Sequence, residues 1–130
     1  MDAALALREK NIKPSMIRVM IYEYLKNSTS HPTADDIFRK LSLEIPTLSK
    51  TSVYNTVKLL SDSGLVLSLT IDSEHTRYDA YTNIHGHFIC DNCRRVYDFP
   101  IDNMQLDMLK DFDIKYKNVY FSGICKECLK

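Results

Sequence analysis

The sequence predicts an α+β fold made of a mainly helical part followed by a small α/β part. Two observations support this division. Apolar residues recur at helical spacing before Gly64 and alternate as in a strand after it, and all four cysteines lie in the last 41 positions. A chain of 130 residues suits one ordinary domain, or two small ones that need outside support.

Two helices are predicted in the first part before residue 46. The first follows Pro14, which suits a first helical position, and carries apolar residues at spacings of three and four. The second opens at Thr33, which together with Asp36 resembles a capping box, and Pro46 closes it. Its expected buried residues are Ile37, Phe38 and Leu41.

A third helix and a β-hairpin complete the first part. The helix begins after the N-cap Ser49 and runs to about Ser63, where Gly64 stops it. Alternating apolar residues then predict a strand at 65–71, and a return strand at 76–81 follows a polar turn. Three helices followed by a β-hairpin make a winged helix-turn-helix.

Beyond a plausible hinge at 82–84, a second domain is predicted at 85–130. Its expected elements are strands at 87–90 and 95–99, an amphipathic helix at about 101–112 and a strand at 114–121. A piece of this size rarely buries enough apolar area to be stable alone. We therefore expect a bound metal and a second copy of the chain as supports, which makes this a dimerisation domain.

Composition excludes several classes of protein. The chain is 45% hydrophobic and 26% charged, as in a soluble globular protein. No apolar run is long enough to span a membrane and the N-terminus does not resemble a signal peptide, so we expect a cytoplasmic protein. Lys plus Arg is 17 and Asp plus Glu is 17, which excludes a polycation that binds nucleic acid by charge alone but allows a local basic face.

The cysteines form two C-x-x-C pairs, Cys90 with Cys93 and Cys125 with Cys128. A cytosolic chain keeps its thiols reduced, so the pairs indicate a metal site before they indicate disulfides. A tetrahedral Zn²⁺ held by four thiolates is the favoured interpretation. A thiol oxidoreductase is the alternative, although a redox motif needs only one C-x-x-C pair. An oxidoreductase predicts reversible thiol activity after metal removal, whereas a structural metal site predicts unfolding.

The third helix has two distinct faces. Its apolar face is formed by Val53, Val57 and Leu60, with Thr56 beside them. The opposite face is short and carries one charge; its residues are Thr51, Tyr54, Asn55 and Lys58. Asn can bind adenine, Tyr or Thr can touch a thymine methyl, and Lys can reach phosphate. We therefore expect 1–81 to be a DNA-binding domain that reads a major groove, the alternative being a surface Tyr that only caps an apolar edge.

Histidines and carboxylates suggest a second metal site. His85 and His87 place two imidazoles on one side of an extended segment, although a plain surface pair is the commoner outcome. His31 could equally be a helix cap. Asp79 and Asp98 lie in apolar strand sequences, where an unpaired carboxylate is costly to bury. Each of these residues is explained if it binds a cation.

In these motifs the chain resembles the ferric uptake regulator family, and within it the peroxide-sensing repressors. The resemblance covers nearly the whole chain. It rests on His31-Pro32-Thr33-Ala34-Asp35, Ser52-Val53-Tyr54, Gly64-Leu65-Val66, Arg77-Tyr78-Asp79, His85-x-His87-x-x-Cys90-x-x-Cys93, Asp98-Phe99 and Cys125-x-x-Cys128. The motifs are specific jointly, although no single one is.

The resemblance implies two metal sites per subunit. The four cysteines would hold a structural Zn²⁺. A regulatory Fe²⁺ or Mn²⁺ would be held by His31, Asp79, His85, His87 and Asp98, a mixed nitrogen and oxygen set that suits these cations. Iron sensors of the family typically carry Glu at the two carboxylate positions, and Asp at both favours the peroxide-sensing branch. There, peroxide oxidises His31 or His85, and the repressor loses its metal and its DNA.

The resemblance also implies a homodimer on double-stranded DNA with a palindromic, A/T-rich operator. The expected DNA contacts are Arg18, Thr51, Ser52, Tyr54, Asn55 and Lys58. Asn55 and Thr56 stand where the family commonly has Arg, so the operator is expected to differ in detail. A repressor that responds to iron, manganese or zinc without sensing peroxide is the closest alternative. A non-haem iron enzyme is more remote, because no nucleophile arrangement is recognisable.

Overall fold

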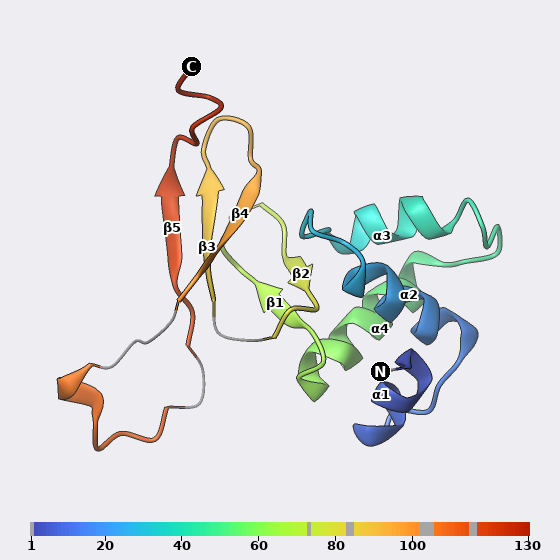
Figure 1. Cartoon of the computed structure of the whole chain (residues 1–130). Coiled ribbons are helices and arrows are strands. Elements are labelled where there is room, and N and C mark those ends of the chain that lie inside the picture. The colour runs from blue at the N-terminus through green and yellow to red at the C-terminus, as the bar shows by residue number, and fades with distance from the viewer. Residues whose placement is uncertain (1, 73, 83–84, 102–105, 115–116) are drawn as a thin grey trace. The chain divides into compact units, whose positions relative to one another are not determined.

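The computed structural model describes the chain except residues 1, 73, 83–84, 102–105 and 115–116 (Figure 1). The chain divides into two compact units, Met1–Thr82 and Asn83–Lys130. The hinge expected at 82–84 falls mostly outside the described residues. None of the helices that the described residues form has the length and apolar character of a membrane span.

Helix α1 (Ala3–Glu9) adds a fourth helix to the three that the sequence predicts in the first part of the chain. The Asp2 side chain caps it by accepting the Ala4 N–H over 3.2 Å. Ala3, Ala6 and Leu7 lie on one face and are buried. An acidic cap followed by a run of Ala and Leu, both strong helix formers, is the signal that could have predicted this helix.

Helices α2 (Met16–Lys26) and α3 (Ala34–Leu41) differ from expectation at one end each. Ser15 caps α2, so Pro14 lies before the cap and is not the first helical residue. The capping box that opens α3 is confirmed, but α3 ends at Leu41, well before Pro46. The buried residues of α3 include Ile37 and Leu41, whereas Phe38 is only half-buried.

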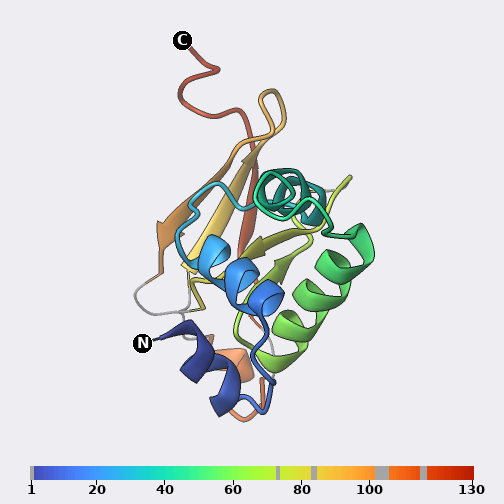
Figure 2. The same ribbon diagram turned by 90° about the vertical axis from the view of Figure 1, so that its right-hand side faces the viewer.

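Helix α4 (Lys50–Ser63) has the bounds that the sequence predicts. The Ser49 side chain accepts the Ser52 N–H over 3.1 Å, and Gly64 ends the helix at φ 85°, a left-handed conformation that favours glycine. Figure 2 shows α3 nearly end-on with α4 beside it. The buried face of α4 consists of Val53, Thr56, Val57 and Leu60, and it packs in the core of the first unit.

The wing is an antiparallel hairpin of β1 (Leu67–Leu69) and β2 (Arg77–Asp79), shorter than the predicted strands. A segment far away in sequence extends it. The Tyr78 N–H donates to the Pro32 carbonyl over 3.0 Å, and Thr33 forms an isolated antiparallel bridge with Arg77. The loop that enters α3 is therefore fixed to the wing.

The second unit is a three-stranded sheet in the order β4-β3-β5 (Figure 1). Strands β3 (His85–Cys90) and β4 (Val96–Pro100) form an antiparallel hairpin, and β5 (Tyr120–Gly123) pairs parallel with β3. The prediction of a strand at 114–121 is wrong in its bounds for the part that the structure describes, because pairing starts at Tyr120 there. Residues 115–116 lie outside the description. The paired residues of β3 and β5 are 33 positions apart in the sequence, which leaves no local signal of register.

The predicted helix at 101–112 is wrong in the part that the structure describes. Only a 3₁₀ turn, η1 (Asp107–Leu109), forms there, and residues 102–105 lie outside the description. Leu106, Met108 and Phe112 are exposed. A short helix is stabilised mainly by burying an apolar face, and these side chains bury none in a single copy of the chain.

Candidate metal centres and nucleic-acid interface

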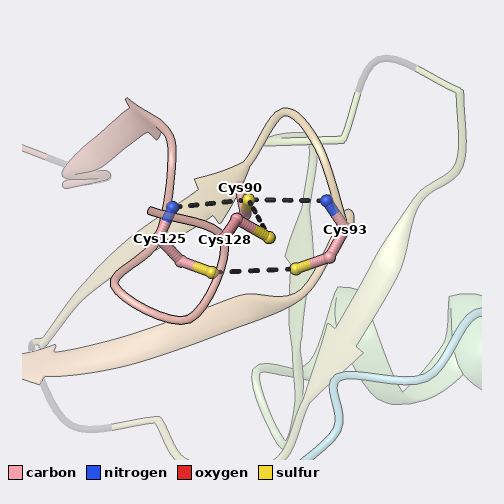
Figure 3. A group of neighbouring side chains, drawn as sticks. All are labelled: Cys90, Cys93, Cys125 and Cys128. Carbon is pink, nitrogen blue, oxygen red and sulfur yellow. Dashed lines mark hydrogen bonds between the residues drawn. The ribbon is translucent and has the colours of Figure 1, made fainter. Parts of the chain in front are cut away.

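The four cysteines meet at one end of the sheet of the second unit. Cys90 ends β3 and Cys93 lies in the turn after it, while Cys125 and Cys128 belong to the turn that follows β5 (Figure 3). All four sulfurs lie within 4.8 Å of one another. The Sγ atoms of Cys90 and Cys128 are 3.7 Å apart, and those of Cys93 and Cys125 are 3.9 Å apart. Thiolates held tetrahedrally by Zn²⁺ at about 2.3 Å lie about 3.8 Å from one another.

Backbone amides prepare this cluster for a cation. The N–H groups of Cys93 and Cys125 each donate to Cys90 Sγ over 3.4 Å, and they lower the pKa of that thiol to about 6. The Tyr97 hydroxyl lowers the pKa of Cys125. A thiolate is the form that binds metal. The sulfur spacing and the lowered pKa values of Cys90 and Cys125 fit Zn²⁺. The neighbouring sulfurs raise the pKa of Cys128 to about 11, so this thiol would have to lose its proton to a bound cation. The described cysteines form no disulfide.

His31 and Asp79 form a pair within the first unit. The distance from His31 Nε2 to Asp79 Oδ2 is 3.5 Å, and both residues are buried. The Tyr81 N–H donates to Asp79 Oδ1 over 2.9 Å, which fixes the carboxylate with its other oxygen toward the imidazole. Two ligands about 2.1 Å from one cation lie roughly 3.0–3.4 Å apart. This pair can therefore supply two ligands to one ion.

His85, His87 and Asp98 form a second group within the sheet of the second unit. The two histidines are two residues apart on β3 and therefore lie on the same face of the strand. Asp98 on β4 is the cross-strand register partner of His87. Asp98 Oδ1 lies 3.6 Å from His85 Nε2 and 3.3 Å from His87 Nε2. Asp98 is 40% exposed, so the expectation of two buried carboxylates is correct for Asp79 and wrong for Asp98. The edge strand β4 leaves that side chain accessible.

The two faces of α4 are those that the sequence predicts. Thr51, Tyr54, Asn55 and Lys58 are exposed, and Ser52 is half-buried. Two of the predicted DNA contacts have partners within the chain: Lys58 Nζ lies 2.8 Å from Asp62 Oδ2, and the guanidinium of the half-buried Arg18 on α2 donates to the Lys13 carbonyl over 2.8 Å. One partner was invisible in the sequence. The Tyr54 hydroxyl donates to Asp35 Oδ1 on α3 over 3.0 Å, across 19 residues that give no local signal.

A winged helix-turn-helix combined with a small sheet domain and a four-thiolate centre defines a metal-binding regulator of the DNA-binding class. The Ferric uptake regulator family matches residues 9–128, and the chain belongs to this family. The resemblance to this family and the α+β fold class, both predicted from the sequence, are therefore confirmed.

Peroxide-responsive regulators are among the similar proteins. The peroxide operon regulator of Bacillus subtilis (strain 168) is 35% identical over 99% of this chain and 92% of its own length. The peroxide-responsive repressor PerR of Staphylococcus aureus (strain Mu50) is 33% identical over 98% of this chain and 89% of its own.

Solved structures share the fold. The ferric uptake regulator Fur of Helicobacter pylori covers 97% of this chain and 88% of its own with a TM-score of 0.81 at 21% identity. PerR of Streptococcus pyogenes covers 98% and 94% with a TM-score of 0.57 at 33% identity. At 21% identity, the likeness to the Fur structure shows a common fold. The PerR structure is also similar in sequence, at 33% identity.

Proposed function

We propose that this protein is a metal-dependent, DNA-binding transcriptional repressor that senses hydrogen peroxide. The observation that carries the proposal is its identity of about one third to peroxide-responsive repressors along nearly the whole chain. Asp at both positions 79 and 98, where iron sensors of the family typically carry Glu, supports the same branch. We place the protein in the cytoplasm.

The regulatory cation, Fe²⁺ or Mn²⁺, would be held by His31, Asp79, His85, His87 and Asp98. Imidazole and carboxylate donors suit these cations better than the soft thiolates do. Within each unit the donor atoms lie at separations close to those of ligands on one ion. Because the ligands come from both units, an ion that they share would fix the angle between the units.

The chain's own histidines would be the targets of the sensing chemistry. Bound Fe²⁺ would provide the one-electron chemistry by which hydrogen peroxide oxidises an imidazole of His31 or His85. An oxidised imidazole no longer offers the same nitrogen lone pair, so the remaining donors hold the cation more weakly. The two units then lose their common ligand set, and the DNA is released. Five ligands on one ion oppose substrate turnover, so we propose that the protein is not an enzyme.

On DNA, α4 would enter the major groove. Thr51, Ser52, Tyr54 and Asn55 would face the bases, while Lys58 and Arg18 would reach the backbone. A homodimer would set two such helices at the spacing of successive major grooves, on a palindromic, A/T-rich operator. Large apolar side chains exposed on the second unit support a second copy as its partner; they include Leu106, Met108, Phe112 and Phe121.

A gel shift on a palindromic A·T-rich probe tests this function. We expect binding with Fe²⁺ or Mn²⁺ and none with chelator, and peroxide should abolish binding only in the Fe²⁺ form. Peptide mass spectrometry should then find added oxygen on the His31 or His85 peptide. Metal-dependent binding that survives peroxide, with both peptides unmodified, would leave a metal-responsive repressor without peroxide sensing.

A further inference from the structure

His31 has an unusual backbone conformation for a candidate metal ligand. Its φ is 55°, in the left-handed region that non-glycine residues occupy rarely and only where the surroundings fix them. The residue after it is held by the wing, because the Tyr78 N–H donates to the Pro32 carbonyl. A hydrogen bond to the carbonyl of His31 would help to hold the backbone of this residue in that conformation.

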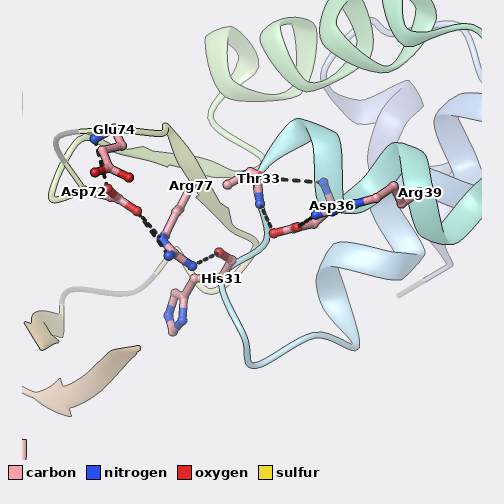
Figure 4. Close-up of polar contacts among 7 residues, drawn as sticks. All are labelled: His31, Thr33, Asp36, Arg39, Asp72, Glu74 and Arg77. Atoms are coloured by element: carbon pink, nitrogen blue, oxygen red, sulfur yellow. Dashed lines mark hydrogen bonds and ion pairs between the residues drawn. The ribbon is translucent and has the colours of Figure 1, made fainter. Parts of the chain in front are cut away.

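Arg77 supplies that hydrogen bond. Its Nη1 donates to the His31 carbonyl over 3.2 Å, while Nε and Nη2 each lie 3.1 Å from Asp72 Oδ2 (Figure 4). The side chain of Arg77 is 15% exposed and that of Asp72 is 2% exposed. A planar guanidinium can satisfy both partners in one orientation, which a lysine ammonium cannot. The ion pair therefore holds the guanidinium in place against the His31 carbonyl.

The same strand carries a candidate ligand. Arg77 and Asp79 are two residues apart on β2, and thus on the same face of the strand. Arg77 fixes the backbone of His31, and Asp79 lies 3.5 Å from the His31 imidazole. Strand β2 thus carries the candidate ligand Asp79, and it also carries Arg77, which contacts the backbone of the other candidate ligand, His31.

We propose that Arg77 is a positioning residue for the regulatory metal, acting through the His31 backbone and itself held by Asp72. This inference rests on the proposed function, in which His31 and Asp79 are ligands. Partners behind the ligands of a metal site commonly change its affinity by about 10- to 100-fold. Replacing Arg77 should therefore weaken metal binding without removing any ligand.

The test uses the full-length, zinc-loaded protein and Mn²⁺, which avoids oxidation. Mn²⁺ binding is measured by calorimetry without DNA, and probe binding is measured as Mn²⁺ is added. We expect Arg77→Gln to raise the half-saturating Mn²⁺ concentration about tenfold, while saturating Mn²⁺ restores full probe binding. Arg77→Lys should raise the half-saturating Mn²⁺ concentration less. The double variant Arg77→Gln with Asp72→Asn should have nearly the same half-saturating concentration as Arg77→Gln alone. Without Mn²⁺, the Tyr78 amide should exchange its hydrogen faster in Arg77→Gln than in the wild type.

Arg39→Gln is the matched control. Arg39 forms an ion pair with Asp36 in the same unit, but its side chain is exposed, and Figure 4 draws no hydrogen bond or ion pair from it to His31 or Arg77. Its removal should leave the half-saturating Mn²⁺ concentration unchanged, because exposed pairs contribute little.

Each outcome decides the inference. An unchanged Mn²⁺ midpoint in Arg77→Gln, or a fall in probe binding that saturating Mn²⁺ does not restore, overturns the positioning role. If Arg77→Gln does not fold, the midpoints of Asp72→Asn and Arg77→Lys decide in its place, and wild-type values in both reject the role. A wild-type protein that binds the probe equally with Mn²⁺ and with chelator contradicts the proposed function instead.

Discussion

Tyr54 shows how one contact defines what a side chain can do. It is exposed on α4, yet its hydroxyl donates to Asp35 on α3. This bond restrains the ring in the free protein, so the proposed contact with a base would cost less conformational freedom. The sequence predicts that Tyr54 faces DNA, but the pairing with Asp35 arises only when α3 and α4 pack together.

We expect Asp35→Ala to lower the ratio of operator affinity to scrambled-DNA affinity about fivefold, the effect of one hydrogen bond of about 1 kcal/mol. Tyr54→Phe should lose the same hydrogen bond, so adding Asp35→Ala to it should not lower the ratio further. Competition gel shifts measure the ratio. Glu44→Ala, which removes one exposed acidic residue from the turn after α3, controls for charge. A ratio in Asp35→Ala equal to that of the wild type would contradict the role of this contact.

Cys90 shows how backbone geometry sets thiol chemistry. The amides of Cys93 and Cys125 lower its pKa to about 6 in the folded chain, whereas an ordinary thiol has a pKa of about 8.5. Zinc binding displaces whatever protons the four thiols carry. Because we expect the second unit to unfold without zinc, its thiols should return to ordinary pKa values and release about four protons per zinc at both pH 7.5 and pH 5.5. Calorimetry in buffers of different ionisation enthalpy measures this number, and a number lower by about one proton at pH 7.5 would show that the metal-free chain keeps the folded cluster with Cys90 as a thiolate.

At the scale of elements, the sequence predicts helix ends that depend on neighbouring residues, but it does not predict strand bounds that depend on distant ones. The cap at Ser49 and the stop at Gly64 predict α4 correctly, because both act within one turn of the helix. The bounds of β5 depend on pairing with β3, whose paired residues lie 33 positions earlier, and the predicted bounds were wrong. The predicted helix near 101–112 has apolar periodicity but buries no apolar face among the described residues.

The same limit applies to the candidate sites. The spacing of the cysteines predicts their cluster, because two C-x-x-C pairs in a chain with reduced thiols usually bind one metal ion. The contact of Arg77 with the His31 carbonyl spans 46 residues, and it uses a backbone atom that no sequence pattern identifies. Candidate ligands were thus accessible to sequence reasoning, whereas a group that contacts the backbone of one of them was not.

Gly86 is a testable feature of the β3–β4 hairpin. A Cβ at this position would lie 2.2 Å from the Phe99 ring, which covers the glycine and stacks on Phe121 at 5.1 Å. We expect Gly86→Ala to destabilise the protein by about 1–3 kcal/mol through overpacking. Thermal unfolding of the zinc-loaded protein measures this.

Truncating the ring provides the control for Gly86→Ala. Phe99→Ala alone loses the stacking, but adding Gly86→Ala to it should cost less than Gly86→Ala costs in the wild type, because the clash is gone. Additive losses in the double variant would mean that Phe99 is not the obstacle.

At the scale of the whole molecule, the two units are stabilised by different means. The first unit has a continuous apolar core built from α1 to α4. The second unit spans Asn83–Lys130, and the turn that bears Cys125 and Cys128 meets the end of β3 at the thiolate cluster. A unit this small needs a metal or a partner subunit to remain folded.

Removal of zinc should therefore affect the two units unequally. We expect a strong chelator to abolish the β-sheet signal in circular dichroism and to dissociate the dimer, while the helical signal of the first unit persists. DNA binding should then be lost even with saturating Mn²⁺, because two unlinked recognition helices no longer address both half-sites. Sedimentation with metal analysis measures the dimer and the bound zinc together. A zinc-free chain that keeps its sheet, its dimer and its Mn²⁺-dependent DNA binding would mean that the four thiols do not stabilise the fold, and would favour a redox role for the C-x-x-C pairs.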